Sequence, residues 1–162
     1  RFKCDWSSDV CSSDLTQGDT ALMVAAGYGL EPQVTHFVPN GRVAAAKYLI
    51  EELGANVNVR NSSGYTPLHG AALAVDHDLI LYLVSQGGNI KARANTVFGG
   101  VGARDKTVTD GTGDTVADMA NGPRPHNMQY PDTVKFLEKL GSDNSQNCRA
   151  STCVVKTTEP FE

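Results

Sequence analysis

The chain lacks the features that would point to a membrane or to nucleic acid. No apolar run approaches the roughly 18 residues that a membrane-spanning helix requires. Positive charge is also scarce, because 14 lysines and arginines face 18 acidic residues and leave a formal net charge of −4. A protein that binds nucleic acid by neutralising phosphates needs a basic face. We therefore expect no membrane span and no nucleic-acid partner.

Aromatic residues are few as well, at 7% of the chain, whereas glycine occurs 16 times. A composition with few large rings and many small residues suits short helices that pack closely together. No segment shows a convincing alternation of apolar and polar residues, which is the pattern of a half-buried strand. The expected fold class is therefore all-α.

Cysteine occurs four times, and two of the four lie in an unusual first segment. Residues 5–15 resemble the translation of a common sequencing-library adapter, which predicts that residues 1–15 are non-native and disordered. The natural protein would then begin near Thr16, with its own N-terminus missing. The alternative is a genuine N-terminal segment with a disulfide between Cys4 and Cys11.

The other two cysteines, Cys148 and Cys153, fall in a polar and aperiodic C-terminal stretch. A local disulfide, which needs an oxidising compartment, and inert thiols are equally acceptable interpretations. A metal half-site with His126 is a third, but two cysteines alone are a weak zinc signal. We expect no metal and no cofactor, and we expect residues 143–162 to form a flexible tail.

What the chain does have is a motif that occurs three times. Its clearest copy runs from Gly64 to Ala72, and weaker copies start at Gly18 and Gly113. In each copy glycine permits a turn, threonine accepts from the unpaired N–H groups of a helix start, and the next position suits proline. Self-similarity at a long period indicates stacked structural repeats, which usually bind other molecules rather than catalyse reactions.

Each copy predicts a pair of short helices that ends at a glycine. The first helices are expected near residues 20–26, 66–73 and 115–120. The second helices are expected near residues 42–53, 77–86 and 131–140. The repeats then cover residues 16–61, 62–95 and 111–142, with an insertion at 96–110.

The stretch from Gly64 to Ala72, followed by residues 83–88, resembles an ankyrin repeat almost position by position. Residues 54–61 are similar to the closing and hairpin element of that family, and the ending from Val134 to Cys148 is similar to C-terminal portions of some bacterial members. The flanking copies lack the proline of the motif and the histidine that follows it. The resemblance implies an ankyrin-type solenoid of about three helix-turn-helix repeats, with inserted loops and projecting hairpin-like turns.

The same resemblance implies a non-catalytic, monomeric module that binds a protein partner through its loop tips and the concave face of its first helices. The contact residues it implies are Asp19, Tyr28, Ser62, Ser63, Tyr65, Leu73, Phe98, Arg104 and Asp114. Tyrosines such as Tyr28 and Tyr65 are enriched in binding hot spots, while a ring packed in the turn is the alternative for Tyr65. For Phe98 and Arg104 the alternative is a mobile loop.

The remaining motif residues are implied to be structural: Thr66, Pro67, Leu68 and His69. His69 is expected to form hydrogen bonds near the helix start rather than to act in catalysis. Two other functions stay open. In the first, the chain is a regulatory or targeting appendage of a larger enzyme whose catalytic part lies upstream. In the second, it is itself an enzyme or metal protein that uses His126, Cys148 and Cys153. The sequence does not indicate the compartment.

Overall fold

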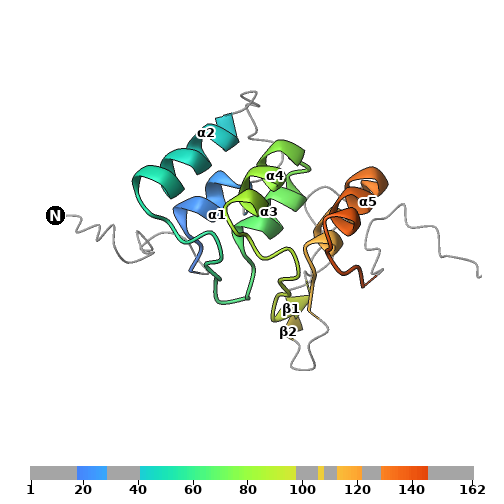
Figure 1. Cartoon of the computed structure of the whole chain (residues 1–162). Coiled ribbons are helices and arrows are strands. Elements are labelled where there is room, and N and C mark those ends of the chain that lie inside the picture. The colour runs from blue at the N-terminus through green and yellow to red at the C-terminus, as the bar shows by residue number, and fades with distance from the viewer. Residues whose placement is uncertain (1–17, 29–40, 98–105, 108–112, 122–128, 146–162) are drawn as a thin grey trace, which may run out of the picture.

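The computed structural model describes residues 18–28, 41–97, 106–107, 113–121 and 129–145 (Figure 1). Within these ranges the chain forms three helix pairs in sequence. The pairs are α1 (Ala21–Ala25) with α2 (Gly41–Lys47) and its π-helical continuation η2 (Tyr48–Glu52), α3 (Pro67–Leu73) with α4 (His77–Ser85), and the 3-10 helix η3 (Ala117–Ala120) with α5 (Pro131–Lys139). The predicted all-α solenoid of three repeats is confirmed, with helix bounds shifted by one or two residues in most cases.

The helix pairs stack so that equivalent helices become neighbours. α3 contacts α1 on one side and η3 on the other, and α2 contacts α4. In Figure 1, α2, α4 and α5 follow one another as an outer row, and α1 and α3 lie beneath the first two. Helices of five to nine residues are marginal in water by themselves, so this stacking must supply most of their stability.

The core is one continuous cluster that runs through all three pairs. Its largest fully buried side chains include Leu22, Leu68, Leu83, Met119 and Leu137, which come from five different helices. Burying one leucine side chain is worth about 1.5–3 kcal/mol relative to leaving it exposed. Because these side chains pack against residues of other pairs, the repeats stabilise one another.

Polar side chains fix the starts of the helices. Thr20 Oγ1 accepts the Met23 N–H over 3.3 Å, and Asp76 Oδ1 accepts the Leu79 N–H over 3.0 Å. These bonds satisfy N–H groups that have no partner within their own helix. In the first two copies of the motif the helix therefore begins directly after the threonine, Thr20 or Thr66, whereas α4 begins after Asp76.

Glycine is required where two repeats approach most closely. At Gly113 a Cβ atom would stand 1.9 Å from the Ala94 carbonyl oxygen and 2.7 Å from the carbonyl carbon. Both atoms belong to the backbone that enters the third repeat, so neither can move aside cheaply. This contact explains why the third copy of the motif begins with glycine.

Two features differ from the expectations. Within the expected insertion at 96–110, strand β1 (Thr96–Val97) pairs antiparallel with β2 (Lys106–Thr107), Thr96 opposite Thr107. Strands of two residues are too short to show an alternating pattern. The first helix of the third repeat is a four-residue 3-10 helix rather than an α-helix.

Residues 143–145, the first part of the expected tail, contact other segments of the chain. Arg93 forms an ion pair with Asp143 at 3.3 Å, and the Ser145 N–H donates to Asp118 Oδ1 over 3.1 Å. The expectations for residues 1–15 and 146–162 fall outside the described residues. No helix in the described ranges is long and apolar enough to cross a membrane.

Candidate interaction surface

The repeated motif builds a buried polar network around His69. The Thr66 N–H donates to His69 Nδ1 over 3.1 Å, and the Thr66 hydroxyl lies 2.9 Å from the same nitrogen. On the other side of the ring, Nε2 lies 3.3 Å from the carbonyl oxygen of Asp114 in the next repeat. Because a carbonyl can only accept, Nε2 carries the proton and Nδ1 accepts.

The electrostatics of this site keep His69 neutral. Burial lowers the pKa of His69 to about 4, although the carbonyl and the charge of Asp114 act in the opposite direction. The ring has no exposed surface, and both of its nitrogens are engaged. A neutral imidazole without access to solvent cannot exchange protons with a substrate, so His69 ties two repeats together, in keeping with the structural role implied for the motif.

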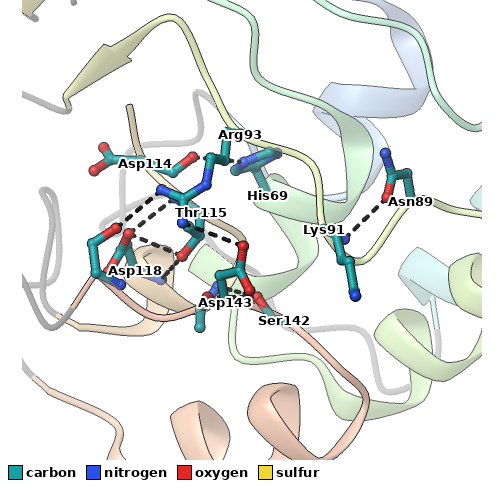
Figure 2. Close-up of polar contacts among 11 residues, drawn as sticks. His69, Asn89, Lys91, Arg93, Asp114, Thr115, Asp118, Ser142 and Asp143 are labelled. Carbon is teal, nitrogen blue, oxygen red and sulfur yellow. Dashed lines mark hydrogen bonds and ion pairs between the residues drawn. The ribbon is translucent and has the colours of Figure 1, made fainter. Parts of the chain in front are cut away.

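Asp118 takes the place of this histidine in the third repeat. It follows Thr115 by three residues, as His69 follows Thr66, and its Oδ2 accepts the Thr115 N–H over 3.0 Å. Its Oδ1 accepts the Ser145 N–H, so it too reaches the next segment of chain. Figure 2 shows this cluster beside His69. Asp118 was not among the residues predicted from the sequence, although the Thr-x-x-Asp spacing is a helix-start signal related to the capping box.

The hairpin segments between repeats are joined by side-chain hydrogen bonds. Asn61 Nδ2–H donates to Asp19 Oδ1 over 2.7 Å. This bond links the turn at the start of the second repeat to the turn at the start of the first. Asn58 donates to the Gly87 carbonyl over 2.9 Å and accepts the Asn89 N–H over 2.7 Å. These bonds fix the positions of successive hairpins relative to one another.

Arginines add to this connection. Arg60 donates to the carbonyl of Arg93 and, over 3.3 Å, to Asn95 Oδ1. Arg93 occupies the equivalent position 33 residues later and donates to Ser145 and Asp143. Each arginine therefore reaches from its own repeat to the following segment, as Figure 2 shows for Arg93.

Four of the expected contact residues are buried. Tyr28, Tyr65, Leu73 and Asp114 each expose 5% or less of their surface. The Tyr65 ring lies 5.2 Å from the Tyr28 ring and 5.4 Å from the His69 ring, and its hydroxyl donates to Asp114 Oδ2 over 3.1 Å. This corrects the expectation of direct contact, because a buried side chain cannot touch a partner while the repeats stay stacked. The alternative interpretation of Tyr65, a packed ring, describes the structure.

Three expected contact residues keep exposed surface, and we call the turn surface formed by Asp19, Ser62 and Ser63 the hairpin edge. Ser62 is exposed, and Asp19 and Ser63 are half-buried beside it. Phe98 and Arg104 lie outside the described residues, as do His126, Cys148 and Cys153. Among the residues that the structure describes, no group of three histidine, cysteine or acidic side chains could hold a metal ion.

Comparison with known proteins agrees with this architecture. The family described as "Ankyrin repeats (3 copies)" matches residues 4–94, which include the first two helix pairs. A stretch of 45 residues is 44% identical to the BTB/POZ domain and ankyrin repeat-containing protein NPR3 of Oryza sativa subsp. japonica. That stretch is 28% of this chain and only 8% of the rice protein. On the family match and the stacked helix pairs together, the chain belongs to the ankyrin-repeat family, whose members generally mediate protein–protein interactions.

Proposed function

We propose that this chain is a non-catalytic module that binds a folded protein partner through its hairpin edge, with Asp19, Ser62 and Ser63 among the contact residues. The contacts are centred on the hairpins because all seven residues of α3 are buried. A helix without exposed side chains offers little to a partner, so α3 has a smaller role than the resemblance implied.

The observation that supports this function most is the rigidity of the exposed edge. Ser62 is exposed, while the flanking Asn61 side chain donates to Asp19 and accepts the N–H groups of Ser63 and Tyr65. A loop held in one conformation before binding loses little conformational entropy when a partner arrives. A preorganised polar edge of this kind suits recognition of another folded surface.

The test compares two variants that each introduce an arginine. Folded protein domains displayed on phage are selected against the wild-type chain, and the affinities of the selected domains are measured by biolayer interferometry. Ser62→Arg adds a large side chain at the hairpin edge, and Gln86→Arg adds the same side chain at an exposed position after α4. We expect Ser62→Arg to weaken most binders by about tenfold or more, which is about 1.4 kcal/mol. Equal affinities for the two variants would reject the hairpin edge.

The appendage hypothesis has weaker support. The name of the rice relative pairs ankyrin repeats with a BTB/POZ domain, so repeats of this kind do occur in a longer protein beside another domain. Nothing in that name refers to an enzyme. Attachment to a catalytic domain therefore stays a prediction, which the sequence of the intact gene would test.

A further inference from the structure

Among the described residues, two large apolar side chains are strongly exposed: Tyr48 at 58% and Leu81 at 47%. They hold the same place in successive repeats, because each lies six residues before the glycine that follows its helix, Gly54 or Gly87. Tyr48 is the first residue of η2, which continues α2, and Leu81 lies in α4. Helix α2 contacts α4, and the two are neighbouring members of the outer row (Figure 1). We call Tyr48 and Leu81 the outer apolar pair. The pair lies on the second helices, whereas Ser62 belongs to a hairpin.

Contacts beneath the pair fix the spacing of the two helices. The Tyr82 hydroxyl of α4 donates to Glu51 Oε1 of η2 over 3.0 Å, and Lys47 Nζ lies 5.7 Å from the centre of the Tyr82 ring. Burial and the bond to Glu51 raise the pKa of Tyr82, so the phenol stays a neutral donor. Packed helices lie 8–10 Å apart, and equivalent side chains on them repeat at about that distance.

The charges around the pair are mainly negative. Glu52 stands one helical turn after Tyr48, and Asp78 stands one turn before Leu81, both exposed. The nearby cation Lys47 is placed over the Tyr82 ring. In the third repeat, Lys135 occupies the place of Tyr48 and Leu81, so the apolar row ends after two repeats and a positive charge follows it.

From this arrangement we propose that the outer apolar pair docks an amphipathic helix of another protein, with basic residues on both sides of its apolar stripe. Residues i and i+7 of a helix lie about 10.5 Å apart on one face. That distance is close to the spacing of stacked helices, so the partner helix would cross η2 and α4 and place one apolar side chain beside Tyr48 and one beside Leu81. Its basic residues would meet Glu52 and Asp78.

The probe is a fluorescently labelled helical peptide of about 18 residues, with leucines at i, i+4 and i+7, lysines flanking the leucines, and alanine elsewhere. Binding to the full chain is followed by fluorescence anisotropy. We expect the double variant Tyr48→Gln with Leu81→Gln to weaken binding by about tenfold or more. Both positions are exposed, so the thermal melt of this variant should match that of the wild type. Ser62→Arg, at the hairpin edge, should leave peptide binding unchanged and thus separates this surface from the one proposed above.

A charge reversal tests the class of partner. Glu52→Lys with Asp78→Lys should weaken binding of the lysine peptide and strengthen binding of an otherwise identical peptide that carries glutamates. Three results would overturn the proposal: no binding up to about millimolar peptide, equal affinity of the wild type for both peptides, or equal affinity of the wild type and the glutamine variant. A dimer in sedimentation that dissociates in the glutamine variant would also overturn it, because the occupant would then be a second copy of the chain.

Discussion

Acid should weaken the stack of repeats through His69. The ring has a pKa of about 4 in the folded chain, against 6.5 for the unperturbed side chain. Between these values the unfolded chain binds the proton and the folded chain does not, so the free energy of unfolding falls as the pH falls. A difference of about 2.5 pKa units corresponds to about 3 kcal/mol, present in full above pH 6.5 and lost as the pH approaches 4.

The assay is urea unfolding followed by circular dichroism at pH 7 and at pH 4.5. His69→Asn removes the titrating ring while its amide oxygen can still accept the Thr66 N–H, so this variant should be less stable than the wild type at pH 7. Its loss of unfolding free energy relative to the wild type should shrink by about 2 kcal/mol or more at pH 4.5. At that pH only the wild type is destabilised by protonation of the imidazole in the unfolded chain.

The matched control is Leu68→Ala, one residue away and also fully buried. Deleting a buried leucine costs about 2–5 kcal/mol and involves no titrating group. Its deficit should therefore be similar at both pH values, whereas that of His69→Asn should not. If the two deficits change in parallel with pH, the assignment of the acid sensitivity to His69 is wrong.

Three further substitutions test how the repeats are joined. Gly113→Ala should lower the free energy of unfolding by about 3 kcal/mol or more, because its Cβ would meet the Ala94 carbonyl at 1.9 Å, and a melt within a degree of the wild type would contradict this contact. Asp118→Ala should cost about 1–3 kcal/mol and speed hydrogen exchange of the Ser145 amide, which loses its acceptor; unchanged exchange would mean that this segment does not dock. Tyr65→Phe should cost about 1–2 kcal/mol in urea unfolding by removing the hydroxyl bond to the next repeat, and it should leave partner affinity unchanged if the ring is purely internal.

The helices were predictable because their signals are local. Thr66 and Pro67 mark the start of α3, and Gly87 marks the end of α4. The apolar residues of α4 recur at helical spacing. The third repeat was predicted less well: a four-residue 3-10 helix forms where an α-helix was expected. The missing proline does not explain this, because the first repeat has Ala21 at the same place and forms an α-helix. The sequence did not predict the pairing of Thr96–Val97 with Lys106–Thr107, because strands of two residues are too short to show an alternating pattern.

The candidate contacts were harder to predict, because burial in a solenoid depends on the neighbouring repeats. Asp19, Tyr65 and Asp114 each follow the first glycine of the motif, so the motif alone gives them one role. In the structure Asp19 stays half-buried at the hairpin edge and accepts from Asn61, whereas Tyr65 and Asp114 bond to each other and lose their surface.

This difference between equivalent positions has a physical cause that bears on the function. A side chain that bonds to the next repeat is buried by the stacking, and a partner can then contact only the side chains that keep exposed surface. Ser62 and Ser63 lie in the hairpin turn, beside that position, where Asn61 holds the backbone. The ordered backbone keeps the two serines in a fixed place. The hydrogen bonds to Asn61 that hold Tyr65 in the core therefore also fix the hairpin edge in one conformation before a partner binds. If that is correct, Asn61→Ala should weaken partner binding as well as the fold, and selected binders that tolerate Asn61→Ala but not Ser62→Arg would contradict it.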